Sequence, residues 1–181
     1  FEFKKLEKKY SKEKNIILNN CAVGDKNCYR DFNITVKTGN SSFNKITPNT
    51  QWLKTRSSQF NISPENYTKN TKSTKIITLD SYCLENQIEN IDILKIDTQG
   101  YEDKVLEGAQ EIMKKEIIYT IESEIMFDDV YEKYFTFTDL EKYLIPNNFR
   151  LAGINTTNNN LFSGIVFFAD VLYFNKKKFK F

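Results

Sequence analysis

The charged residues at the ends of two apolar segments are the side chains of this sequence best placed to do chemistry. Lys95 and Asp97 end the segment 91–97, and Glu122 and Glu124 end the segment 117–124. Side chains two residues apart point to the same side of a strand, so each pair shares a face. An unpaired ammonium inside an apolar strand would cost several kcal/mol, and Lys95 is therefore predicted to pair with a carboxylate.

The absence of histidine restricts what these four residues can do. It excludes Ser-His-Asp and Cys-His catalysis and histidine-based zinc sites. A general base must then be Asp, Glu, Lys or Tyr. Three interpretations stay open: a carboxylate base, a divalent-metal site at Asp97, Glu122 and Glu124, and a structural ion-pair network. No Asp-x-Asp spacing supports the metal site.

Length and composition favour one globular domain over residues 1–181, with 40% hydrophobic residues. A net charge of +2 gives no reason to expect nucleic acid or an anionic membrane as a partner. No apolar run approaches the roughly 20 residues that span a bilayer. Three scattered cysteines without Cys-x-x-Cys favour a reducing compartment, so a cytoplasmic location is expected. Nothing in the sequence indicates the oligomeric state.

Segments 91–97 and 117–124 are predicted to be adjacent parallel strands. Gly100 ends the first apolar run, and the helical apolar spacing of 102–115 predicts a crossover helix. A right-handed crossover sets the second strand beside the first. The charged side chains would then meet at the carboxyl ends of the strands, where open α/β sheets bind ligands.

The other predicted elements are a helix over 1–12, a strand within 15–25, a strand over 29–37 pairing with the preceding turn, a strand over 74–79, helices over 82–88 and 138–145, and antiparallel strands over 149–154 and 165–174. Asp80 or Ser81 is expected to cap the helix over 82–88. Thr138 with Glu141 is expected to cap the helix over 138–145. The polar stretch 38–74 is long enough to be functional or unordered. From its residues alone, Trp52 in this stretch would fill a satellite hydrophobic cluster.

The central segment also resembles the signature of the FkbM-type methyltransferases. That signature runs Asp-Leu-Leu-Lys-Ile-Asp, a variable residue, Glu-Gly and a later Glu. The chain has Asp92-Ile93-Leu94-Lys95-Ile96-Asp97-Thr98-Gln99-Gly100-Tyr101-Glu102, with Gln99 where the family often has Glu. Further matches follow the family order: Ala22-Val23-Gly24-Asp25, Thr78-Leu79-Asp80-Ser81, Val105-Leu106-Glu107-Gly108-Ala109 and Ala169-Asp170.

The resemblance implies a Rossmann-like class I methyltransferase fold of the α/β class, with a mostly parallel sheet and an antiparallel carboxyl-terminal strand pair. It implies methyl transfer from S-adenosylmethionine to a hydroxyl of a sugar, glycan or secondary metabolite. Asp97 would accept the hydroxyl proton or orient the acceptor, with Glu122 or Glu124 as second choice and Lys95 keeping the carboxylates ionised. The implied cofactor contacts are Asn20, Cys21, Ala22 and Asp97, and the implied acceptor contacts are Trp52, Gln99, Glu102 and Tyr131.

One part of such a fold has no counterpart in the sequence. Class I methyltransferases begin with a strand, a Gly-rich turn and a helix, but none of the six glycines forms Gly-x-Gly. The resemblance therefore implies an amino-terminally truncated domain, about its carboxyl-terminal three quarters. The missing strands would lie between 16–18 and 91–97 and leave two open sheet edges. An inactive remnant of the fold is thus another alternative.

Overall fold

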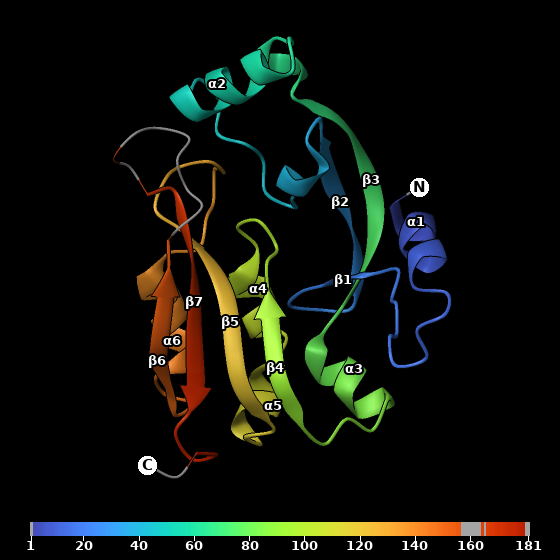
Figure 1. The fold of residues 1–181 in the computed structure, drawn as a ribbon, viewed down its shortest axis with the longest axis vertical. Coiled ribbons are helices and arrows are strands. Elements are labelled where there is room, and N and C mark those ends of the chain that lie inside the picture. Colours follow the sequence, from blue (N-terminus) through green and yellow to red (C-terminus); the bar gives the residue numbers. More distant parts are fainter. Residues whose placement is uncertain (1, 157–163, 165, 180–181) are drawn as a thin grey trace.

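The chain forms two β-sheets that lie side by side, with helices around them (Figure 1). The structure is a computed structural model that describes residues 2–156, 164 and 166–179. The helices are α1 (Glu2–Lys9), α2 (Gln51–Gln59), α3 (Leu79–Glu85), α4 (Glu102–Glu107), α5 (Gln110–Lys114) and α6 (Phe137–Leu144), with 3-10 turns η1 (Thr38–Asn40) and η2 (Pro64–Asn66). The strands are β1 (Ala22–Val23), β2 (Cys28–Thr35), β3 (Thr68–Ile77), β4 (Ile91–Ile96), β5 (Ile118–Met126), β6 (Phe149–Asn155) and β7 (Phe168–Asn175).

The larger sheet has the strand order β4-β5-β7-β6 and carries the charged residues singled out above. β4 and β5 are parallel, with Lys95 opposite Glu122. β7 is antiparallel to both β5 and β6. Helices α4, α5 and α6 lie over one face (Figure 1), where Ile121 and Ile125 are fully buried. The predicted parallel neighbours and the antiparallel carboxyl-terminal pair are confirmed.

The smaller sheet has the strand order β1-β3-β2. β2 and β3 pair antiparallel from Cys28 opposite Ile76 to Thr35 opposite Thr68. β1 adds two residues parallel to β3. A second buried cluster joins α2 to the end of β5, and its members are Trp52, Leu53, Tyr67, Met126, Val130, Tyr131 and Phe167.

The prediction of a mostly parallel sheet is wrong, because both sheets are mixed. β1/β3 and β4/β5 are parallel, whereas β2/β3, β5/β7 and β6/β7 are antiparallel. The segment 36–67 returns the chain so that β3 runs back along β2, and antiparallel neighbours need no crossover helix. For the same reason the segment 29–37 pairs with β3, not with the preceding turn as predicted.

Two predicted elements are interrupted or displaced. The strand expected within 15–25 is reduced to β1, and Ile17 is 80% exposed, so the apolar run 16–18 is not a core strand. The crossover helix is broken into α4 and α5 at Gly108. A Cβ at Gly108 would lie 2.0 Å from the carbonyl oxygen of Gly24, so the backbones touch at the break.

The two predicted helix caps are also shifted. Thr78 caps α3 by accepting a hydrogen bond from Ser81 N at 3.0 Å. Asp80 instead accepts from the N–H groups of Glu111 and Ile112 at 3.0 and 2.9 Å, which fastens the start of α5. The capping box of α6 is formed by Thr136 and Asp139, not by Thr138 and Glu141. α2 and the first half of β3 lie in the stretch for which the sequence predicted no element.

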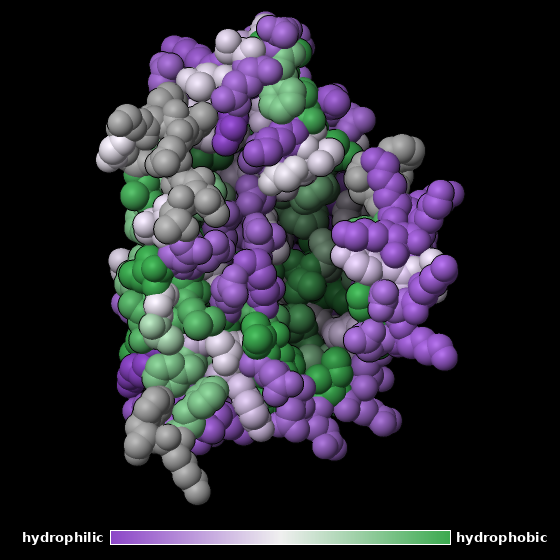
Figure 2. Space-filling model, viewed as in Figure 1, coloured by the Kyte–Doolittle hydropathy of each residue, from purple (hydrophilic) through white to green (hydrophobic). Residues whose placement is uncertain are grey.

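Each sheet has an edge strand on the side of the other sheet. In the described part of the chain, β4 pairs only with β5, and β1 pairs only with β3. Figure 2 shows a hollow between the two sheets with hydrophobic residues in its depth. Of the helices that the structure describes, none is both long and apolar enough to cross a membrane.

Candidate active site

The loop between β4 and α4 forms one wall of the site. Gly100 has φ of +87°, which favours glycine, and a Cβ there would lie 3.1 Å from the Tyr131 ring. Oε1 of Glu102 accepts hydrogen bonds from Thr98 N at 2.9 Å, Thr98 Oγ1 at 3.0 Å and Gly100 N at 3.3 Å. Glu102 is 2% exposed, and burial raises the pKa of its carboxyl. The structure therefore places Glu102 inside its own loop, where it fixes the turn.

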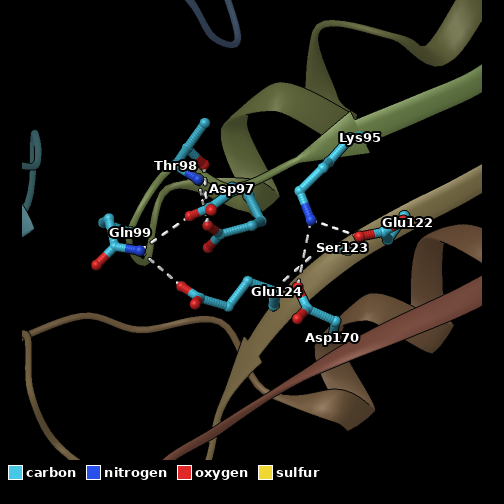
Figure 3. A network of polar contacts seen from close by, with 9 residues as sticks. Lys95, Asp97, Thr98, Gln99, Glu122, Ser123, Glu124 and Asp170 are labelled. Atoms are coloured by element: carbon cyan, nitrogen blue, oxygen red, sulfur yellow. Dashed lines mark hydrogen bonds and ion pairs between the residues drawn. The ribbon is translucent and has the colours of Figure 1, made fainter. Parts of the chain in front are cut away.

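Gln99 connects the acids of β4 and β5 (Figure 3). Its Nε2 donates to Asp97 Oδ1 at 2.9 Å and to Glu124 Oε2 at 2.7 Å. The hydroxyl of Tyr131 lies 3.1 Å from Gln99 Oε1 and 3.0 Å from the carbonyl oxygen of Asn40. Tyr131 is 1% exposed, so it contacts Gln99 from the protein interior. This network fixes the orientation of the Gln99 amide.

Glu124 is a buried carboxyl in an acidic environment. It lies on β5 opposite Asp170 of β7 and is 8% exposed. Burial raises the pKa of Glu124 to about 8, and the negative charges of Asp97, Glu102 and Asp170 contribute, whereas Lys95 lowers it. Such a group holds its proton at neutral pH and releases it under mildly alkaline conditions. A pKa close to the working pH is what general acid–base chemistry requires.

Lys95 pairs with carboxylates on β5 and on β7, the next strand of the sheet beyond it (Figure 3). Its Nζ donates to Glu122 and lies 3.5 Å from Asp170 Oδ1. The predicted pairing with a carboxylate is thus confirmed, but Asp97 is not the partner. The prediction that Lys95 is buried is wrong, since its side chain is 51% exposed on β4. The hydrogen bond to Glu122 is the main cause that raises the pKa of Lys95.

A cavity of about 310 Å³ opens beside Gln99 and Glu124, a volume suited to a small ligand. It is lined by Lys37, Gly39, Asn40, Trp52, Arg56, Gln99, Glu124, Met126, Val130, Phe167 and Phe168. Trp52 forms part of this wall and also packs against Tyr67, with ring centroids 5.8 Å apart. Both interpretations of Trp52 therefore have a structural basis.

The other predicted residues lie elsewhere. Asp97 is exposed at the end of β4, and neither Asp97 nor Glu122 lines the cavity beside Glu124. Asn20, Cys21 and Ala22 line a separate hollow with Phe3, Leu6, Asn19, Phe32 and Thr74. Within the described ranges, no three acidic or cysteine side chains come together to hold a metal ion, so the divalent-metal alternative has no site there.

Sequence reasoning missed three residues of this region: Lys37, Arg56 and Asp170. Lys37 is the last residue of the predicted strand 29–37, and Arg56 lies in the stretch 38–74, where no element was predicted. Asp170 could have been predicted from the sequence, because it lies on the strand antiparallel to β5. An acid at that position is expected to face Glu122 or Glu124. The sequence had already indicated this strand by its Ala169-Asp170 pair.

The fold and the position of these polar residues define an α/β protein whose polar site lies at the carboxyl ends of the parallel strands β4 and β5. The chain belongs to the methyltransferase FkbM domain family, whose model matches residues 1–151. A comparison with curated proteins and one with solved structures gave no match. The resemblance inferred from the central segment is thereby confirmed, and methyl transfer is the reaction class that the family supports.

Proposed function

We propose that this protein transfers a methyl group from S-adenosylmethionine to a hydroxyl oxygen of a sugar, glycan or secondary metabolite, with Glu124 as the base. The observation that carries the proposal is the position of Glu124, a buried carboxyl that lines a ligand-sized cavity and has a pKa of about 8. Asp97 was the first choice for this role, but it does not line that cavity. Glu124 therefore replaces Asp97 as the proton acceptor.

Asp97 is the described residue that best fits the cofactor. It is an exposed carboxylate at the carboxyl end of β4, and it can accept hydrogen bonds from ribose hydroxyls or an amine. Its Oδ1 is already oriented by Gln99. Asn20, Cys21 and Ala22 lie in a separate hollow, and their contact with the adenine remains a prediction from the family resemblance.

The protein contributes mainly by positioning the acceptor and by taking its proton. When bound, S-adenosylmethionine supplies an electrophilic methyl group, whose C–S bond breaks with the electron pair left on sulfur as the acceptor oxygen bonds to carbon. Glu124 in its ionised form accepts the hydroxyl proton and later releases it to solvent. Gln99 holds Glu124 in place, and Trp52, Met126 and Val130 give the cavity an apolar wall.

Two variants test the proposal in the longest form of the protein that its gene encodes. Asp97→Asn should weaken S-adenosylhomocysteine binding, measured by calorimetry, at least about tenfold, since an amide replaces the accepting carboxylate. Asp92→Asn, at an exposed position of the same strand, is the matched control. Glu124→Gln should lower methyl transfer to a sugar panel by about 10²–10⁴-fold and leave S-adenosylhomocysteine binding unchanged.

The proposal would be overturned if S-adenosylhomocysteine does not bind at all. That result would leave a protein that keeps the family fold without its activity. Full activity of Glu124→Gln would overturn the role of Glu124 alone.

A further inference from the structure

We propose that the methyl acceptor carries an anionic group, a carboxylate or a phosphate, that is bound by Lys37 and Arg56 in the cavity beside Glu124. The inference rests on the proposed function, because it names the class of acceptor for the same cavity. It makes an acidic sugar, not a neutral one, the preferred acceptor.

Two cations from different parts of the chain line this cavity. Lys37 precedes the 3-10 turn η1, and Arg56 lies on α2. Among the residues that the structure describes, neither of them forms an ion pair. Lys95, Lys104 and Lys142, by contrast, each have a carboxylate partner. The two cavity cations are therefore available to a ligand.

Arg56 has hydrogen-bonding capacity that its protein contacts leave unused. Its Nη1 donates to Gln59 Oε1 at 3.0 Å, and its guanidinium carbon lies 6.0 Å from the centre of the Trp52 ring. The buried Nε has no hydrogen-bond partner within the described part of the chain. A guanidinium has five N–H donors in a planar fork, a geometry that suits carboxylate and phosphate oxygens.

The lining of the cavity does not neutralise these charges. Among the described residues that line it, the one acid is Glu124, and the raised pKa of about 8 leaves this carboxyl mostly protonated at neutral pH. The cavity wall thus carries two positive charges in a chain whose net charge is only +2. A cleft lined by one sign of charge concentrates ligands of the opposite sign. Trp52 adds an aromatic surface against which the apolar side of a sugar ring can pack.

The test is direct binding of matched sugars without any cofactor, measured by calorimetry. The probes are methyl glucuronide, glucose 6-phosphate and the uncharged methyl glucoside. We expect at least one of the two anionic probes to bind tenfold or more tightly than the glucoside, and the better one identifies carboxylate or phosphate as the group. Lys37→Gln and Arg56→Gln should each remove most of this difference. Lys54→Gln, at an exposed position of α2 outside the cavity, should keep it.

The outcomes separate this inference from the proposed function. Equal binding of charged and neutral probes, no saturable binding of either anionic probe, or preference unchanged in both variants would overturn it. Methylation of neutral sugars as efficient as that of acidic ones would overturn it while upholding the methyltransferase activity. Anion binding that depends on Lys37 and Arg56, in a protein that fails to bind S-adenosylhomocysteine, would uphold the anion site and overturn the proposed function.

Discussion

Gln99 Nε2 lies 2.7 Å from Glu124 Oε2 and 2.9 Å from Asp97 Oδ1, so one neutral amide separates two acids of adjacent strands. Its two N–H donors serve both carboxyl groups, while its oxygen faces the hydroxyl of Tyr131. The amide thereby limits the mutual repulsion of Asp97 and Glu124. The pKa of Glu124 should depend on this contact.

Replacing Gln99 by Glu, the residue the family often has there, should raise the pKa of Glu124 further above about 8. The substitution removes a donor and adds a further negative charge beside Glu124. Carbon NMR of the Glu124 carboxyl as a function of pH measures the shift. Gln51→Glu on the exposed side of α2 is the matched control and should leave the titration unchanged. A lower pKa in Gln99→Glu would contradict the account of this contact.

The buried Glu124 should make the protein less stable as pH rises. Its pKa is raised from 4.5 to about 8 in the folded state, so the native protein binds more protons than the unfolded chain between these values. The contribution of Glu124 is therefore fully present below about pH 4.5 and lost as pH passes about 8. The slope can reach roughly 1.4 kcal/mol per pH unit.

Urea unfolding of the native protein and of Glu124→Gln measures this slope. The variant should show a flatter dependence of unfolding free energy on pH, because its amide does not titrate. Glu85→Gln, an exposed position on α3, should reproduce the native slope. Parallel curves for the native protein and Glu124→Gln would show that another group dominates.

Lys95→Gln should change the free energy of unfolding by less than about 1 kcal/mol, because the Lys95 and Glu122 side chains are 51% and 34% exposed. It should nevertheless raise the pKa of Glu124, since the positive charge of Lys95 lowers that pKa. The same NMR titration and urea unfolding test both expectations. Lys114→Gln breaks an exposed ion pair on α5 and should leave Glu124 unaffected. A decrease of several kcal/mol in the unfolding free energy of Lys95→Gln would show that the Lys95–Glu122 ion pair is essential for stability.

Gly108→Ala should destabilise the protein by about 2 kcal/mol or more, because the added Cβ would lie 2.0 Å from the backbone oxygen of Gly24. The contact is between two backbones, so no side-chain rotation can relieve it. Urea unfolding measures the loss. Gly153→Ala on β6 is the control, since a Cβ there meets nothing within 4 Å. Equal stability of both variants would disprove the close approach.

The central part of the site could be predicted because its determinants are local. The two-residue periodicity of 91–97 and 117–124 and the right-handed crossover rule were enough to bring Lys95 beside Glu122. The same reasoning put Lys95 in the core, which is wrong because the exposure of a strand depends on its neighbours. β4 has a partner on one side only in the described part of the chain.

The cavity could not be predicted because its walls come from distant segments. Lys37, Arg56 and Glu124 meet only after β3 has folded back along β2 and α2 has packed on Met126 and Val130. The pKa of Glu124 likewise depends on burial and on Asp170 from the last strand, which no local pattern encodes.

The one-sided pairing of β4 has a consequence for amide hydrogen exchange. Ile91 N donates to Ile117 O at 2.9 Å, so alternate amides from Ile91 onward point to β5, and those between them point to the open side. The exchange rates of neighbouring amides along this single strand should alternate between slow and fast. Uniformly slow exchange would reveal that another segment or molecule closes the sheet in solution.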